Sequence, residues 1–90
     1  MDVYFTDIAN KELKNWLKSD RTMAKKVYDL ISDIQEYRML GGRGKPEQLK
    51  YYKNPVRFSR QINKGDRLVY CLKDKKDLLI LSCKGHYDDK

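Results

Sequence analysis

The stretch GGRGKPEQLK, residues 41–50, separates two patterns of apolar residues. Before it, apolar residues recur every three or four positions, which is typical of the buried face of a helix. After it, apolar and polar residues tend to alternate, which is typical of a strand. The glycines Gly41 and Gly42 are a stop signal for the helix that precedes them. The sequence therefore predicts a helical half followed by a sheet half.

The helical half is predicted to hold a short first strand and two helices. Residues 3–5 are rich in strand-forming side chains. Thr6 or Asp7 can cap the first helix, and Ser19 or Asp20 can cap the second. The two apolar stripes are Ala9, Leu13, Trp16 and Leu17, and Met23, Val27, Leu30, Ile31, Ile34 and Tyr37. We expect an antiparallel hairpin over about residues 7–40, with both stripes in the core.

The sheet half, about residues 47–87, contains four predicted strands near residues 47–52, 56–63, 67–73 and 78–84. Short polar links between successive strands predict hairpins, and hence an antiparallel sheet. The whole chain, residues 1–90, is then a single α+β domain. The helical hairpin packs on one face of this sheet and leaves the other face available.

The positive charge of the chain lies in its second half. Residues 1–40 carry 7 basic and 7 acidic side chains, and residues 41–90 carry the other 13 basic against 6 acidic ones, so the formal charge of +7 belongs to the sheet half. This asymmetry indicates an anionic partner, most simply a nucleic acid. A membrane is disfavoured, because no basic amphipathic helix carries the excess and no apolar run approaches the roughly 20 residues of a bilayer span. Without a signal peptide, we expect a cytoplasmic protein.

Cysteine and histidine are too sparse for a metal centre. Cys71 and Cys83 fall in apolar segments and form no CxxC pair, and His86 is the single histidine. A zinc site would lack ligands unless carboxylates joined it. We therefore expect buried, reduced thiols, no metal and no cofactor.

Three side chains in the sheet half could together cleave RNA. Glu47 stands among the basic residues Arg43, Lys45 and Lys50, while Arg67 begins a strand and His86 follows the last one. Metal-free RNA cleavage needs a base for the 2′-hydroxyl proton, a cation for the charge at phosphorus and an acid for the departing 5′-oxygen. A carboxylate, a guanidinium and an imidazole supply these groups. Taken singly, His86 could simply be solvated and Glu47 could be an ordinary first strand residue.

Four fragments resemble one known family when they are taken in order: GRGKPEQLK, FSRQI, DRLVY and the terminal CKGHY. They are similar to the YoeB/Txe toxins of bacterial toxin–antitoxin modules, which have the RelE-like microbial-ribonuclease fold. The resemblance implies a ribosome-dependent endoribonuclease, an mRNA interferase that cuts mRNA in the ribosomal A site and inhibits translation. It also implies a cognate YefM/Axe-like antitoxin, which we expect to be acidic and partly disordered, and it is compatible with a homodimer.

The resemblance implies a role for each matching residue. Glu47 corresponds to the general base, His86 to the general acid, and Arg67 to the arginine that stabilises the transition-state phosphate. Tyr87 matches the tyrosine beside the acid, with a stacking or orienting role. Contacts to the RNA backbone are expected from Arg43, Lys45, Lys50 and Arg60.

The sequence departs from the family pattern at several positions. Gln61 replaces the second arginine of an SRR fragment, Asp66 stands where a histidine is common, and Gly85 stands where an aromatic residue often precedes the His-Tyr pair. The chain also continues past Tyr87 with residues 88–90, which include two carboxylates. These two carboxylates could raise the pKa of the His86 imidazole and repel substrate phosphate, or the added residues could simply be disordered.

Two other interpretations use the same residues. The chain could be a non-catalytic RelE-fold module that binds nucleic acid or the ribosome, or that inhibits another target, since the charge asymmetry supports binding as well as it supports cleavage. It could also be a basic globule in which Glu47 and His86 have no role. Cleavage of mRNA by the wild type, and its loss on substitution of His86, separates the nuclease from both.

Overall fold

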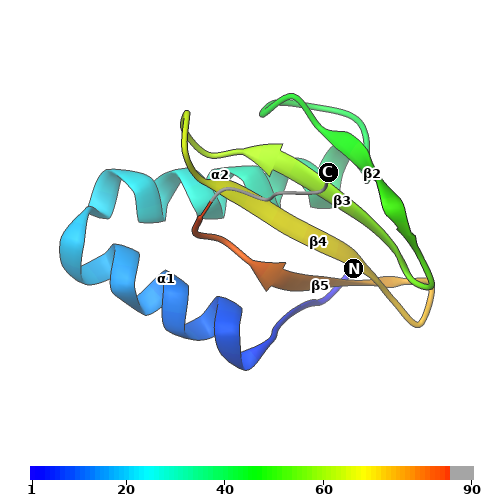
Figure 1. The fold of residues 1–90 in the computed structure, drawn as a ribbon, viewed down its shortest axis with the longest axis horizontal. Coiled ribbons are helices and arrows are strands. Elements are labelled where there is room, and N and C mark those ends of the chain that lie inside the picture. The colour runs from blue at the N-terminus through cyan, green and yellow to red at the C-terminus, as the bar shows by residue number, and fades with distance from the viewer. Residues whose placement is uncertain (86–90) are drawn as a thin grey trace.

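Two helices and five strands form a two-layer α+β domain (Figure 1). The computed structural model describes residues 1–85. In chain order the elements are β1 (Val3–Phe5), α1 (Asp7–Ser19), α2 (Arg21–Tyr37), β2 (Glu47–Lys53), β3 (Val56–Gln61), β4 (Arg67–Lys73) and β5 (Asp77–Ser82). Every element predicted from the sequence is present, and the predicted fold class is confirmed.

The sheet has the order β1-β5-β4-β3-β2 and is mixed rather than antiparallel. Strands β2 to β5 form an antiparallel meander, as their short links predicted. Strand β1, however, pairs in parallel with β5, with Val3 opposite Leu78 and Phe5 opposite Ile80. The prediction of a purely antiparallel sheet was therefore wrong at this edge. The chain between β1 and β5 includes both helices and the rest of the sheet, which is long enough for a parallel return.

The helix boundaries follow from side-chain caps. Thr6 Oγ1 accepts a hydrogen bond from the backbone N–H of Ala9 at 3.1 Å, and Asp20 accepts from the N–H groups of Thr22 and Met23. Thr6 and Asp20 are thus the caps among the predicted alternatives. Helix α2 ends at Tyr37, before the glycine pair, because the backbone of the next residue turns to a φ of 68°.

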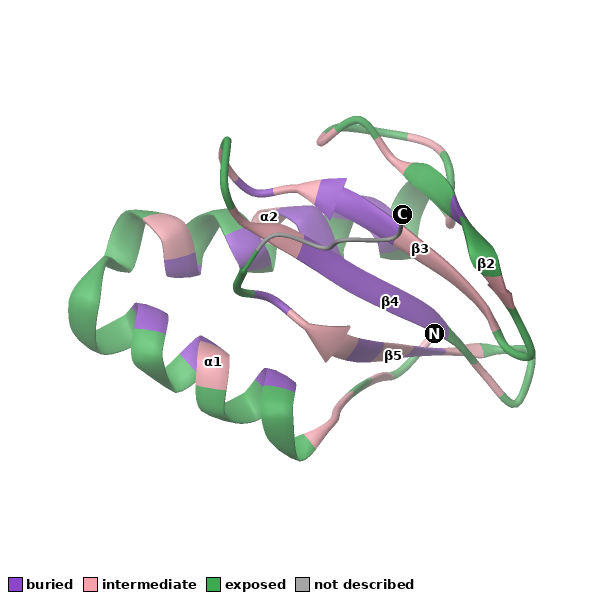
Figure 2. Cartoon of the chain, viewed as in Figure 1, coloured by how far each residue is buried: buried purple, intermediate pink, exposed green. Residues whose placement is uncertain are grey.

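The core lies between the helices and one face of the sheet (Figure 2). Leu68 and Tyr70 of β4 are completely buried in it, and most of the predicted helix stripes join them. Two predicted core residues are instead exposed: Leu17 by 41% and Tyr37 by 54%. They lie at the margin of a stripe and at a helix end, where helical periodicity alone does not fix burial.

The other sheet face, called the open face below, is turned away from both helices (Figure 1). On β4 the open face carries Arg67, Val69 and Cys71, which confirms the predicted alternation, although Val69 and Cys71 are themselves buried. Neither α1 nor α2 has the length and apolar content that crossing a bilayer requires.

Candidate active site

The open face brings Glu47 and Arg67 together, although they are twenty positions apart in the sequence. Glu47, the first residue of β2, lies opposite Ser59, and Arg67, the first residue of β4, lies opposite Gln61. Strand partners that are directly opposite point to the same face. The Oε1 atom of Glu47 lies 3.7 Å from Nη1 of Arg67. Two of the three predicted reactive groups thus share one surface.

The pair is accessible and loosely held. The Glu47 side chain is 57% exposed and the Arg67 side chain 25% exposed. A separation of 3.7 Å is an ion pair but exceeds a good N–H···O hydrogen bond. The carboxylate therefore keeps lone pairs free to accept a proton, and the guanidinium keeps donors for a phosphate oxygen.

The segment that leads to Glu47 is anchored on helix α2 through Asp33. The backbone N–H of Arg43 donates to Asp33 Oδ2 at 2.7 Å, and the Arg43 guanidinium binds both carboxylate oxygens, through Nε at 3.1 Å and Nη2 at 3.0 Å. These hydrogen bonds hold the pKa of the Asp33 carboxyl below its ordinary value. Arg43 was predicted to contact RNA, but its charge is already paired with Asp33, so its main visible role is to fix this loop.

Arg60 lies beneath the same loop and is completely buried. Its Nη1 donates to the carbonyl of Arg43 and its Nη2 to the carbonyl of Arg38, each at 2.8 Å, and its Nε donates to the hydroxyl of Tyr70 at 2.9 Å. A guanidinium that has no accessible surface, and whose three nitrogens all donate within the protein, is not available to a phosphate in this structure. The predicted backbone contact by Arg60 is therefore corrected to a structural role. The sequence missed this role because only the folded loop supplies the carbonyls.

Gly44 lets the loop lie against β3. Its φ is 89°, and an added Cβ atom would come within 2.9 Å of Leu30 Cδ2 and 3.1 Å of Arg60 Cβ. Its carbonyl accepts the backbone N–H of Gln61 at 2.6 Å. Because a side chain would collide there, glycine is required for the approach that sets the start of β2.

The last described residue, Gly85, is attached to the start of β4. Its carbonyl accepts the backbone N–H of Arg67 at 3.1 Å, and its N–H donates to Asp66 Oδ1 at 2.7 Å. Asp66, noted as a departure from the family pattern, thus fixes the end of the described chain beside Arg67. The predicted residues His86 and Tyr87 lie outside the described residues.

The remaining predicted contacts are exposed cations near the pair. Lys45 and Lys50 are both exposed, and they lie two and three positions from Glu47 in the chain. Sequence reasoning missed Ser59, which is fully buried opposite Glu47 and whose Oγ has no hydrogen-bond partner within residues 1–85. Side chains of a strand alternate between the two faces of the sheet, and Ser59 of β3 pairs with Val69, which is on the open face. The same alternation, applied to β3, would have placed Ser59 on the open face.

The two thiols do not belong to the reactive set. Both cysteines are free and buried, as predicted. Burial raises the pKa of the Cys83 thiol to about 12, with a further contribution from the carboxylates of Glu12 and Asp66. Burial also raises the pKa of the Cys71 thiol. Neither is an activated nucleophile, because activation requires a lowered thiol pKa.

The geometry defines a small basic α+β domain with a carboxylate–guanidinium pair on the open face of its sheet. Residues 5–87 match the family described as YoeB-like toxins of bacterial type II toxin–antitoxin systems. The toxin YoeB of Synechocystis sp. is 37% identical over 87 residues, which cover 97% of this chain and 98% of that protein.

Two solved structures from Staphylococcus aureus have the same fold. The YoeB dimer is 38% identical with a TM-score of 0.86, and the YoeB–YefM heterotetramer is 37% identical with a TM-score of 0.84. Each comparison covers 97% of this chain and 98% of the other. The chain therefore belongs to the YoeB-like toxin family of type II toxin–antitoxin systems, as its resemblance indicated.

Proposed function

We propose that the chain is a ribosome-dependent endoribonuclease that cuts mRNA in the ribosomal A site by general acid–base catalysis. Glu47 takes the proton of the 2′-hydroxyl, whose oxygen attacks the adjacent phosphorus. Arg67 stabilises the added negative charge on the phosphate oxygens, and His86 gives a proton to the 5′-oxygen as its bond to phosphorus breaks. The products are a 2′,3′-cyclic phosphate and a 5′-hydroxyl.

The observation that carries this proposal is the pairing of Glu47 and Arg67 on the open face. A proton acceptor 3.7 Å from a guanidinium suits the nucleophile side of transphosphorylation, which needs a base beside a cation. Because both groups begin regular strands, the sheet holds their spacing before substrate arrives, which lowers the cost of organising the transition state.

The leaving-group side of the reaction is assigned to the end of the chain. His86 follows directly after Gly85, which is hydrogen-bonded to Arg67 and Asp66. An imidazole has an ordinary pKa near 6.5 and can carry a proton at neutral pH. Tyr87 then stacks on a nucleobase of the RNA or orients the imidazole of His86. The exposed Lys45 and Lys50 attract the RNA backbone, and their contribution falls as salt rises.

The partner proposed for inhibition is an acidic antitoxin. The S. aureus relative is described in a YoeB–YefM complex, and another structure is described as a YoeB dimer. We extend both kinds of assembly to this chain. Action on translating ribosomes would place the protein in the cytoplasm.

The test measures mRNA cleavage on translating ribosomes with purified toxin. Glu47→Gln and His86→Gln should each reduce the rate by about 10²–10⁴-fold, because each removes one proton transfer. Arg67→Lys should reduce it by about 10²-fold, since lysine keeps the charge but loses the planar donor pair.

Matched controls separate chemistry from charge and folding. Glu36→Gln removes an exposed carboxylate on α2 and should cut at the wild-type rate. Equal, ribosome-specific cleavage by wild type and Glu47→Gln would remove Glu47 from the mechanism. A wild type that binds ribosomes yet never cuts mRNA would favour the non-catalytic binding module instead.

A further inference from the structure

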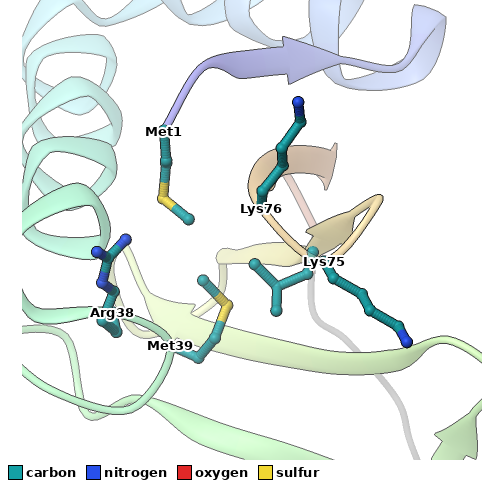
Figure 3. Close-up of a pocket in the computed structure, with 6 residues that line it drawn as sticks. Met1, Arg38, Met39, Lys75 and Lys76 are labelled. Carbon is teal, nitrogen blue, oxygen red and sulfur yellow. The ribbon is translucent and has the colours of Figure 1, made fainter.

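A recess, shown in Figure 3, lies beside the turn that follows β4, at the other end of that strand from Arg67. It has a volume of about 450 Å³ and is lined by Met1, Arg38, Met39, Leu72, Lys75 and Lys76. We call it the methionine pocket. Arg67 begins β4 and Lys73 ends it, so the strand separates the two sites by roughly 20 Å. The methionine pocket is therefore not part of the candidate active site.

The floor of the methionine pocket is apolar. Met1 and Met39 extend toward each other across it (Figure 3). Leu72 belongs to the helix-covered side of β4, yet it is 39% exposed, whereas Leu68 and Tyr70 on the same side are completely buried. The core thus remains open at this end. Flexible methionines around an exposed leucine form a surface that adapts to an inserted apolar side chain.

The rim of the methionine pocket is cationic. Arg38, Lys75 and Lys76 surround the apolar floor, and none of the acidic residues in the described range 1–85 lines it. Within residues 1–85, none of these three side chains forms an ion pair. The two carboxylates of the adjoining turn have other contacts, since Asp74 pairs with Lys73 and Asp77 accepts the backbone N–H of Asp2. The rim therefore keeps its positive charge for a partner.

Two of the three rim cations, Arg38 and Lys75, have backbone conformations that large side chains rarely adopt. Arg38 has a φ of 68° and a ψ of −161°, a region that is almost restricted to glycine. The buried Arg60 fixes it there by donating to its carbonyl at 2.8 Å. Asp74 and Lys75 have φ values of 55° and 63° in a hairpin turn, where asparagine and glycine are favoured. Large side chains at strained positions are characteristic of ligand sites.

We infer that the methionine pocket anchors an acidic segment of the antitoxin, which inserts one apolar side chain between Met1, Met39 and Leu72 and places carboxylates against the rim. This inference rests on the proposed function in taking the antitoxin as the partner. The apolar floor disfavours a nucleic-acid backbone, which requires polar contacts along its path. The charge and the floor together match a peptide that is acidic and amphipathic.

Anchoring at this end has a consequence for regulation. An antitoxin that spans from the methionine pocket to the active site would bind through two separated contacts on one chain. The second contact then benefits from the high local concentration that the first creates. Substitutions in the methionine pocket should weaken the toxin–antitoxin complex and leave the positions of the Glu47 and Arg67 side chains unchanged.

The test measures the dissociation constant between the cognate antitoxin and full-length toxin carrying Glu47→Gln as a common, inactive background. Lys75→Glu with Lys76→Glu should weaken binding about ten-fold at low salt and less at high salt, because rim ion pairs are lost and screened. Leu72→Asp should weaken it about thirty-fold, as for a central apolar anchor.

Two controls match these variants in chemistry and exposure. Leu17→Asp alters a leucine that is 41% exposed on α1, and Lys11→Glu with Lys14→Glu reverses two exposed charges on the same helix. Both controls should bind within about two-fold of the background, the resolution we set for the assay.

Lys75 and Lys76 lie in an exposed turn, so their charge reversal should not disturb folding. This variant therefore keeps the test valid even if Leu72→Asp fails to fold. Binding of the charge-reversed toxin at the background affinity overturns the methionine pocket as an anchor while leaving the antitoxin partnership intact. Failure of the unsubstituted background protein to bind the antitoxin overturns the partnership and the anchor together.

Discussion

Replacing Arg60 by leucine should unfold the loop that carries Glu47 rather than merely weaken RNA binding. The substitution removes the donors that now reach the carbonyls of Arg38 and Arg43 at 2.8 Å and the Tyr70 hydroxyl at 2.9 Å. Each buried acceptor left unpaired costs about 1–3 kcal/mol. Two effects reduce the total for the three acceptors: the loop carbonyls can turn partly to water, and the variant no longer buries a charge. We therefore take the low end of the sum, a loss of about 3–4 kcal/mol in the free energy of unfolding.

Urea denaturation followed by circular dichroism measures this cost. With a slope of about 1–2 kcal/mol per molar urea, the midpoint should fall by about 1.5–4 M. Arg21→Leu is the matched control: Arg21 is exposed at the start of α2, where a positive charge opposes the helix dipole, so its removal should change stability by less than about 0.5 kcal/mol. If Arg60→Leu keeps the wild-type midpoint but loses affinity for ribosomes, Arg60 contacts RNA and the structural role is refuted.

Three further predictions concern strain, protons and thiols. Arg38→Gly should raise the free energy of unfolding by about 1 kcal/mol. Glycine relieves the strained φ, ψ pair, and this gain exceeds the entropy that glycine loses on folding. A lower stability of the variant in urea would show that Arg38 is not strained. Asp33 has a lowered pKa in the folded state, so its stabilising contribution is present above the ordinary Asp pKa of 3.8 and disappears as the pH falls through the lowered value. The stability difference between wild type and Asp33→Asn should therefore shrink on acidification, and a difference that stays constant down to about pH 2 would count against it. Cys71 and Cys83 should resist a disulfide-exchange reagent at about pH 8 in the native protein and react in denaturant, whereas rapid labelling of the native protein would show that the thiols are accessible.

The sequence was sufficient to predict the features of the fold and the site that depend on a local pattern of residues. The bounds of β4 were predicted correctly because alternation, a preceding turn and a following turn all agree over residues 67–73. The convergence of Glu47 and Arg67 follows from hairpin connectivity, which places the starts of β2 and β4 at the same end of the sheet. Both residues begin strands, and their side chains reach the same face through strand pairing alone, so no further tertiary detail was required.

The features that sequence reasoning missed depend on groups that the fold alone brings together. Arg60 looked like a surface cation because arginine is rarely buried, and its burial depends on carbonyls presented by a loop about twenty residues away in sequence. The parallel pairing of β1 with β5 was invisible to a pattern that treats each strand separately. The methionine pocket joins the first residue, the end of α2 and a hairpin turn, which share no local signal.

The attack of a 2′-oxygen activated by Glu47 beside Arg67 is tested most directly on mRNA that carries a single 2′-deoxy nucleotide at the cleaved position. Programmed ribosomes hold this mRNA and its unmodified counterpart in the same frame. The proposed mechanism predicts that wild-type toxin cuts the unmodified message to a 2′,3′-cyclic phosphate and leaves the 2′-deoxy message intact. Cleavage of both messages at equal rates would contradict it.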